Sequence, residues 1–443
     1  MRPPPHGGEG TSMSADQCSY QYWLGPREVK YSGSGVERSV RPSATIRRAL
    51  AVLDTIGVTK VADVTDLDRV GIPNFMTVRP HDLGPGMSYY NGKGTTRADA
   101  YAGALMEAIE RHAGERYDGP VLASSHHNLR SEHACIDPLE IHVPMVRRYS
   151  ERLMLEWVLG FDLMTRRPTF APLNCVVAPY SDPGLSLFYT STNGLASGNT
   201  RVDAVCHALC EVIERDATAL ALARAEVRPA VAAILADMGF GDAAPPERGE
   251  VPLISLRRLP RRAAALVRKL QRAGLKVQLQ NLTSAIGIPT IGCTITEPQG
   301  LPTVVNTYAG CGTHPDARIA LIRALTEAAQ SRLTCIQGGR EDLPDFVPPA
   351  GAPPVEARAG AGEPLRFDDL PSYQYPSVNE DVEFIIERMR QSGFDQIVVV
   401  DITRADVGIP VVRVIVPRTE IWTLYFAHGS RASLGLRALQ EIR

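Results

Sequence analysis

The sequence lacks the features that would insert it into a membrane or export it. No apolar run is long enough to span a bilayer, and the first residues, M-R-P-P-P-H-G-G-E-G, contain no signal-peptide core. A net charge of −2 gives no general attraction to nucleic acid or to an anionic membrane, so any basic patch must be local. We therefore expect a cytoplasmic protein that binds neither nucleic acid nor membrane.

The sequence also lacks paired cysteines and a glycine-loop phosphate motif. Its eight cysteines are scattered without a C-x-x-C pair, and disulfides are not expected in a reducing compartment. Cys206, His207 and Cys210 fall in one predicted helix. Because His207 points away from the line that joins the two cysteines, packing in the core is favoured over zinc binding.

A repeated acidic segment is the main feature that the sequence does contain. The pattern T-R-x-D-A-x-x-x-A-L-x-E-x-I-E-R begins at Thr96 and again at Thr200, and a looser copy begins at Thr313. Each copy opens T-x-x-D, in which threonine can cap the first amides and aspartate suits the positive end of a helix. All three segments are therefore predicted to start helices.

Acidic side chains three residues apart would lie on one face of each of these helices. The pairs are Glu107 with Glu110, Glu211 with Glu214, and Glu327 with Gln330. One such face alone is ordinarily a solvated face with intrahelical ion pairs. If the helices converge, however, the glutamates would repel unless they held divalent cations, and magnesium accepts such oxygen ligands together with water and phosphate oxygens. The pattern predicts a magnesium-nucleotide site whose phosphates are bound by arginines.

A second repeat has the order helix, glycine, strand, G-I-P and strand, which predicts an α+β fold of antiparallel sheets packed by helices. Its G-I-P motifs begin at Gly71, Gly287 and Gly408. Two units are followed by a glycine-rich segment, predicted to be a turn, and then by an acidic helix. Lys93 lies in the first such turn and is either a phosphate contact or part of the turn only.

The predicted domain organisation is a disordered tail, one catalytic domain and a short C-terminal segment. The tail covers residues 1–29, the domain covers 30–430, and 431–443 form a helix or a tail. A proline-rich excursion near 342–376 is expected to lie outside the core.

Several motifs in a fixed order resemble the YcaO family from about Lys30 to Pro417. They are Y-N-G-K-G, M-E-A-I-E-R, S-T-N-G-L-A-S-G-N-T with E-V-I-E-R-D-A, G-C-G-T-H with L-T-E-A-A-Q-S-R, and V-V-D-I-T with G-I-P-V-V-R-V-I-V-P. The resemblance implies a YcaO-like fold with converging acidic helices, and ATP and Mg²⁺ as cofactors. It implies magnesium ligands at Glu107, Glu110, Asn199, Glu211 and Glu214. It implies ATP contacts at Lys30, Arg38, Lys93, Asp203, Arg215, Arg323, Glu327, Gln330 and Arg332, of which Lys30 and Arg38 equally suit a plain loop.

The chemistry implied by this resemblance is activation of a peptide-bond amide. A nucleophile adds to the carbonyl, ATP phosphorylates the amide oxygen, and phosphate leaves. Sulfide as the nucleophile gives a thioamide, whereas a side chain of the substrate gives an azoline or, for nitrogen, an amidine.

The sequence favours the thioamide branch, because it lacks the P-x-P-x-P tail of many azoline-forming members and resembles the members that act with a TfuA-type partner. The expected partners are a peptide or protein substrate, a TfuA-like protein and, as in the family, a second copy of the chain. No leader-binding module is recognised before Lys30. The alternative from another class is a noncatalytic nucleotide-binding adaptor.

Overall fold

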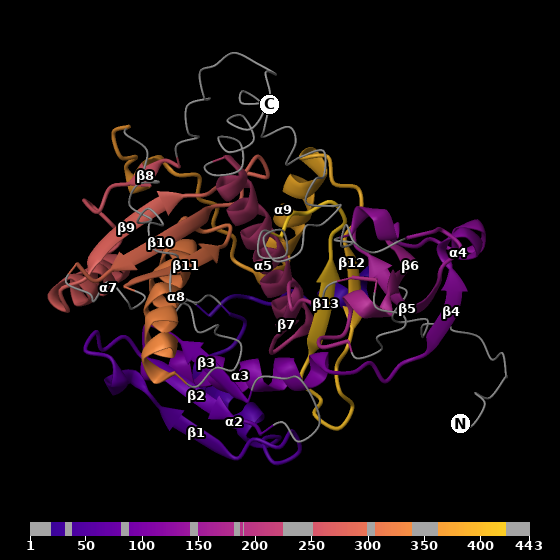
Figure 1. Ribbon diagram of the computed structural model, residues 1–443, viewed down its shortest axis with the longest axis horizontal. Helices are drawn as coiled ribbons and strands as arrows, with labels where there is room; N and C mark the ends of the chain where they lie inside the picture. The colour runs from indigo at the N-terminus through magenta and orange to yellow at the C-terminus, as the bar shows by residue number, and fades with distance from the viewer. Residues whose placement is uncertain are drawn as a thin grey trace, which may run out of the picture.

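Three copies of one helix-strand-strand unit form the framework of the structure (Figure 1). The computed structural model describes residues 19–31, 38–80, 88–141, 149–180, 187–188, 190–224, 251–298, 306–338 and 362–421. The three units are α2 (Pro42–Leu50), β1 (Lys60–Asp63) and β2 (Asn74–Val78); α7 (Arg261–Arg272), β9 (Lys276–Asn281) and β10 (Thr290–Thr296); α9 (Val378–Gln391), β12 (Val398–Asp401) and β13 (Val411–Ile415). The repeated unit predicted from the sequence is confirmed.

Each unit is completed by a third strand that leads into a long helix. These pairs are β3 (Tyr89–Lys93) with α3 (Arg97–Gly114), β11 (Thr307–Thr313) with α8 (Ala317–Gln337), and β7 (Leu195–Ser197) with α5 (Arg201–Leu222). Although β7 and α5 precede α9 in the chain, β7 pairs with β13. The third unit is therefore assembled from two separate parts of the chain, which is why the sequence linked an acidic helix to only two units.

The strands form three antiparallel sheets. Their orders are β1-β2-β3, β11-β10-β9-β8 and β4-β5-β12-β13-β7, with β6 paired to β5. The remaining strands are β4 (Val121–Ser125), β5 (Met154–Asp162), β6 (Arg167–Pro172) and β8 (Leu253–Ile254). The remaining helices are α1 (Tyr20–Leu24) and α4 (His126–Glu132), with 3₁₀ turns η1 (Thr65–Leu67), η2 (Pro138–Glu140), η3 (Leu173–Cys175) and η6 (Phe367–Asp369). The fold class predicted from the sequence is confirmed.

Threonine caps start two of the long helices, as predicted. The side chains of Thr96 and Thr200 accept hydrogen bonds from the backbone amides of Asp99 and Asp203. In α8 the prediction was wrong in detail, because the side chain of Asp316 is the cap. A short polar acceptor is needed at each helix start, and in α8 the aspartate supplies it.

The segments predicted to be glycine-rich turns are strands instead. Their glycines let a helix pack directly on the strand backbone: a Cβ at Gly92 would overlap the backbone nitrogen of Ala104 in α3. A Cβ at Gly310 would likewise overlap the backbone nitrogen of Ala328 in α8. These glycines are required by close approach of two backbones, and not by a turn.

Three apolar clusters form the core. One cluster joins α5 to α9, β12 and β13, the second joins α3 to β5, and the third joins α7 and α8 to β9 and β10. Cys206 and Cys210 are buried in the first cluster, which confirms their predicted packing role. Each of the helices α5, α3 and α8 thus buries one face in its own cluster. The burial fixes the rotation of each helix about its axis, and with it the direction in which the opposite face points.

Two boundaries predicted from the sequence are wrong. The tail predicted over 1–29 includes α1, whose Trp23 is 0% exposed, and residues 1–18 lie outside the described part of the chain. The excursion predicted near 342–376 includes Phe367 and Leu370, which are buried against the third cluster. Residues 342–361 and 422–443 lie outside the description. Isolated aromatic and leucine residues anchor these segments, and composition alone did not reveal them.

No helix in the described ranges combines the length and the apolar character that crossing a bilayer requires.

Substituting alanine at the strand glycines tests the close packing. Gly92→Ala is expected to lower the free energy of unfolding by about 1–3 kcal/mol or more, because the methyl group meets backbone atoms that cannot move aside alone. Chemical denaturation measures the change. Gly103→Ala in α3 is the control, since its Cβ would lie 3.5 Å from the nearest atom. That change should be neutral or stabilise by about 0.5–1 kcal/mol, and equal effects of the two variants would contradict the packing account.

Candidate functional site

A cavity of about 630 Å³ lies where α3, α5 and α8 meet β3 and the chain after β7. Eleven of the fourteen residues predicted for the site line it. They are Arg38, Lys93, Glu107, Glu110, Asn199, Glu211, Glu214, Arg215, Arg323, Glu327 and Gln330. The acidic helices therefore converge, as the sequence predicted.

The four glutamates of α3 and α5 differ in how their oxygens are held. Glu110 Oε2 accepts hydrogen bonds from the backbone amide and the hydroxyl of Ser197, at 2.9 and 3.2 Å. Glu107 Oε1 accepts from Arg111 Nε at 2.9 Å. Glu214 Oε2 is buried and accepts no hydrogen bond from the residues that the structure describes. Such an orphaned carboxylate oxygen needs a cation or a proton.

Burial makes three of these carboxylates, Glu110, Glu211 and Glu214, hard to ionise. It raises the pKa of Glu110 well above its ordinary value, and the neighbouring charge of Glu107 raises it further. Burial also raises the pKa of Glu211. Burial, with the charge of Glu327, raises the pKa of Glu214 to about 7. A divalent cation bound among these oxygens would replace the protons that otherwise neutralise them.

The third helix brings mainly cationic and neutral groups to the cavity. Lys93 on β3 forms an ion pair with Glu327 on α8. Burial would raise the pKa of Glu327, but the charge of Lys93 and its hydrogen bond outweigh burial, and the pKa of Glu327 is lowered. Gln330 donates a hydrogen bond to the carbonyl of Asn91 at 2.6 Å. Arg323 lines the same wall, and its buried Nε lacks a hydrogen-bond partner in the described ranges.

The predicted equivalence of Glu327 and Gln330 with the glutamate pairs is wrong. Gly92 packs on residues 100–104 of α3, whereas Gly310 packs on residues 324–328 of α8. If the residues that contact the two glycines are taken as equivalent, Glu327 of α8 corresponds to residue 103 of α3. This position is one turn before Glu107, the first glutamate of the pair in α3.

The positions of Glu107 and Glu110 correspond by the same count to Ser331 and Thr334, which also line the cavity. The third helix therefore breaks the threefold repeat, because hydroxyl groups stand where the other two helices carry glutamates. The four glutamates lie on α3 and α5, whereas α8 brings Arg323, neutral groups and one carboxylate, Glu327, which is paired with Lys93.

Three predicted contacts, Lys30, Asp203 and Arg332, do not line the cavity. Arg332 is buried and forms ion pairs with Asp68 and Glu297, at 3.1 and 2.8 Å. These ion pairs give it a structural role that a helical pattern cannot distinguish from a role in ligand binding.

Lys30 Nζ lies 2.5 Å from the buried carboxylate of Asp381. Asp381 also groups with Cys206 and His314 at spacings that could hold a metal ion. The positive charges of Lys30 and of nearby arginines lower the pKa of His314 beyond the effect of burial. A further cation is therefore disfavoured there, and Lys30 is a buried structural charge.

Asp203 supports a residue that lines the cavity. Its carboxylate accepts hydrogen bonds from the amide and the hydroxyl of Ser39, which fixes the backbone next to Arg38. Asn199 is held in a comparable way, since its side-chain oxygen accepts from Thr45 Oγ1 at 3.0 Å. Asp203 therefore positions a cavity residue and does not itself line the cavity.

Two further cavity residues were not assigned to the site from the sequence. Arg111 pairs with Glu107 at 2.8 Å, and the glutamates of both acidic helices raise the pKa of its guanidinium. His207 lies one turn before Glu211, so helical spacing alone could have placed it on the same face. Burial and the charge of Arg38 lower the pKa of His207 well below its ordinary value, and the imidazole is neutral.

The residues present fit a magnesium-nucleotide complex. Four glutamates and the oxygen of Asn199 offer hard ligands, and the orphaned oxygen of Glu214 has no other partner among described residues. Arg38, Arg215 and Arg323 add planar donors that suit phosphate oxygens.

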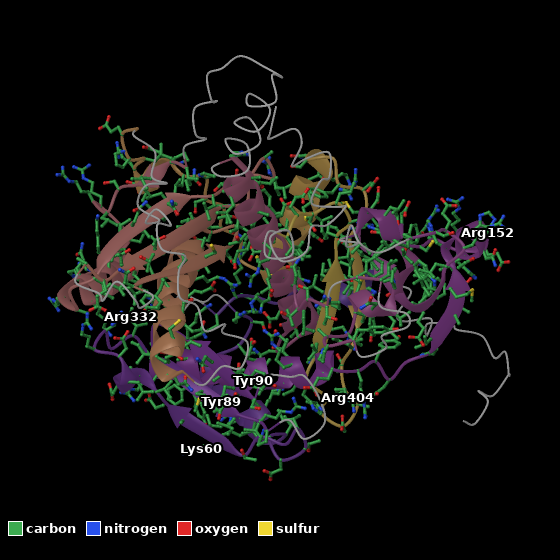
Figure 2. The ribbon with its side chains drawn as sticks, viewed as in Figure 1. Lys60, Tyr89, Tyr90, Arg152, Arg332 and Arg404 are labelled. Atoms are coloured by element: carbon green, nitrogen blue, oxygen red, sulfur yellow. The ribbon has the colours of Figure 1, made fainter. Side chains whose placement is uncertain are left out.

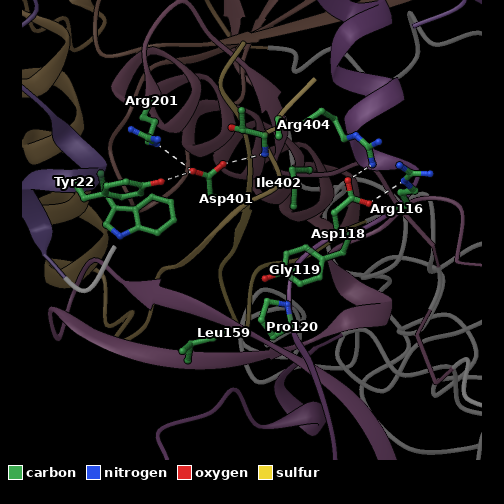
Figure 3. A pocket seen from close by; sticks show the side chains of 14 residues that line it. Tyr22, Arg116, Asp118, Gly119, Pro120, Leu159, Arg201, Asp401, Ile402 and Arg404 are labelled. Atoms are coloured by element: carbon green, nitrogen blue, oxygen red, sulfur yellow. Dashed lines mark hydrogen bonds and ion pairs between the residues drawn. The ribbon is translucent and has the colours of Figure 1, made fainter. Parts of the chain in front are cut away.

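A second cavity of about 440 Å³ lies between α1, the chain after α3 and the end of β12 (Figure 3). Arg201 donates to Asp401 at 3.1 Å. Arg116 and Arg404 contact Asp118, at 2.9 and 2.5 Å. Because guanidinium groups already hold both carboxylates, this cavity does not match the predicted cation site.

Comparison with known proteins decides the family. A family model described as YcaO cyclodehydratase, ATP- and Mg²⁺-binding, matches residues 91–420. The chain belongs to the YcaO family. The YcaO description also confirms ATP and Mg²⁺ as the predicted cofactors.

Two relatives and one solved structure of the YcaO family cover most of the chain. A Methanothermobacter thermautotrophicus protein is 36% identical over 87% of this chain and 96% of its own length. A Rhizobium leguminosarum bv. trifolii protein from the tfuA 3' region is 31% identical over 94% of this chain and 96% of its own length. The YcaO from Methanopyrus kandleri, bound with AMPPCP and Mg²⁺, is 27% identical, with a TM-score of 0.69 over 91% of this chain and 98% of that one.

The raised carboxylate pKa values predict how stability depends on pH without divalent cations. A glutamate whose folded pKa is about 7 keeps a proton that it loses near 4.5 when unfolded. The free energy of unfolding should therefore fall by about 1–3 kcal/mol as pH rises from about 5 to about 8. Added Mg²⁺ should reverse the loss at pH 8. Glu214→Gln should flatten the curve, whereas exposed Glu383→Gln should not; identical curves for all three proteins would contradict this.

Proposed function

We propose that this protein uses ATP and Mg²⁺ to phosphorylate the oxygen of a peptide backbone amide, and that sulfide replaces this oxygen to give a thioamide. The substrate is a ribosomally made peptide or a protein. Amide, sulfide and ATP are converted to thioamide, ADP and phosphate, and the phosphate carries away the amide oxygen. The observation that carries the proposal is the set of four converging glutamates with one orphaned oxygen, in a cavity that is also lined by Arg38, Lys93, Arg215 and Arg323.

One set of cavity residues would bind the metal, and another set would bind the phosphates. Glu107, Glu110, Glu211, Glu214 and Asn199 would hold magnesium ions or their waters. When bound, ATP supplies the phosphoryl group and Mg²⁺ offsets the charge that develops on it.

Arg38, Lys93, Arg215 and Arg323 would orient the phosphates, with Glu327 and Gln330 on the same wall. The Lys93–Glu327 pair keeps the lysine fixed at the cavity wall. Preorganised cations of this kind stabilise a transition state without reorganising during the reaction.

The relative from the tfuA 3' region supports thioamide formation with a TfuA-like partner. Azoline or amidine formation is the alternative within the same chemistry, and the word cyclodehydratase in the family description favours it. A noncatalytic adaptor is the alternative from another class. The complete glutamate set argues against an adaptor, because simple nucleotide binding does not need four carboxylates in one cavity, two of them buried.

Removing two of the cavity carboxylates should stop turnover. Glu211→Gln with Glu214→Gln is expected to lower magnesium-dependent ATP turnover by at least about 100-fold, because the metal loses two of its anionic ligands. Phosphate release measures the rate, and circular dichroism checks the fold. Glu383→Gln with Glu387→Gln, on the exposed face of α9, is the matched control. Full activity of the cavity variant would disprove the assignment of the site.

The mass of a candidate peptide distinguishes the possible products. The peptide is incubated with this protein, a TfuA-like partner, ATP, Mg²⁺ and sulfide. A gain of about 16 Da that requires ATP is expected for exchange of oxygen for sulfur. A loss of about 18 Da would instead show azoline or amidine formation. No change with any candidate, together with ATP binding, would favour the adaptor.

A further inference from the structure

The outer face of α7 carries a concentration of positive charge that the rest of the chain does not share. Residues 257–276 contain eight basic residues and no acidic one. The basic residues are Arg257, Arg258, Arg261, Arg262, Arg268, Lys269, Arg272 and Lys276, and all eight are exposed. Because the whole chain has a net charge of −2, the other residues together carry −10. We call these eight residues the α7 basic face.

The helix holds this face toward solvent because its other side is packed. Ala263, Leu266, Val267 and Leu270 are buried in the third apolar cluster. At about 100° per residue, the five basic residues within α7 fall in an arc of about 120° on the opposite side. The arrangement is therefore rigid, and the charges form one continuous surface about 18 Å long.

Five of the eight charges lack an ion-pair partner among the residues that the structure describes. Arg257, Arg258, Arg261, Arg268 and Arg272 have no carboxylate within 4 Å in the ranges that the structure describes. Neighbouring like charges repel, and no ion pair to these five arginines offsets the repulsion in the part of the chain that the structure describes.

Two of the arginine positions are unfavourable for the local backbone structure. Arg261 and Arg262 are the first two residues of α7, where the helix dipole disfavours cations, and Pro260 provides no side-chain cap. Arg258 has a φ of 57°, which costs about 1 kcal/mol for a residue with a Cβ. Sequences that break local rules without a structural gain do so most often at functional surfaces.

We propose that the α7 basic face is a docking surface for an acidic polypeptide segment. Guanidinium groups bind carboxylates in bidentate pairs, and the positive end of the α7 dipole adds to the attraction for anions. A segment of about six extended residues or three helical turns matches the length of the face.

The face fits other anionic partners less well. It carries no aromatic residue on which bases could stack, and a long nucleic acid would extend over a surface whose net charge is negative. It exposes no large apolar side chain for a bilayer, because the apolar side of α7 is buried.

Charge reversal tests the proposal with the full-length protein and no nucleotide. Binding of fluorescein-labelled poly-L-glutamate of about 20 residues is measured by anisotropy at low and high salt. Arg261→Glu with Arg268→Glu should weaken binding at least about tenfold and reduce its salt dependence. Arg152→Glu with Arg167→Glu is the matched control, since it changes the net charge equally; Arg152 lies at the far end of the molecule (Figure 2). The control should change binding less than about twofold.

Several results would overturn the proposal. Equal weakening in both pairs of variants would mean that only net charge matters. Binding of a 20-base-pair DNA duplex or of vesicles with anionic lipid is measured in the same way. If one of them binds more tightly than poly-L-glutamate, and the charge-reversal variant loses that binding, the face belongs to that partner instead. If charge reversal unfolds the protein, Arg268→Gln with Arg272→Gln repeats the test without added acids. None of the eight residues lines the cavity, so the test is independent of the proposed function.

Discussion

Repulsion among buried carboxylates is the constraint on which the site depends. Glycines in β3 and β11 let the long helices pack backbone to backbone on their strands, and α3, α5 and α8 then converge on one cavity. Glu110 and Glu214 are each less than a tenth exposed there. Hydrogen bonds from Ser197 hold one of them, but the second keeps an oxygen without a described partner. A cation is the ligand that would satisfy this arrangement.

The three long helices do not contribute the same side chains to the cavity. Two helices present glutamate pairs, whereas α8 presents hydroxyl groups at the equivalent positions and carries Arg323 about two turns before the first of them. A complex of metal and phosphate needs anionic ligands on one side and cationic donors on the other. The repeated helices already supply both kinds of group through Arg111 and Arg215, and α8 adds Arg323 where a third glutamate pair would have added only negative charge.

Periodicity and capping were sufficient to predict the units, the starts of α3 and α5 and the glutamate faces of these two helices, because these depend on nearby residues. The sequence could not show that β7 pairs with β13, since that pairing joins distant segments in reversed order. The sequence also could not distinguish Arg332 and Lys30, which form buried ion pairs, from the basic residues that line the cavity. Structural ion pairs and ligand contacts use the same residue types. The anchoring of Trp23 was hidden for a related reason: one aromatic residue in a polar segment gives no periodic signal.

Calorimetric titration with AMPPCP, with Mg²⁺ or with EDTA in its place, tests the central claim most directly. If the buried glutamates are the metal site, nucleotide should bind at least about tenfold more tightly with Mg²⁺, because the carboxylates otherwise repel its phosphates. Equal affinity under both conditions would show that the glutamates do not hold the metal, and would contradict the account of the cavity.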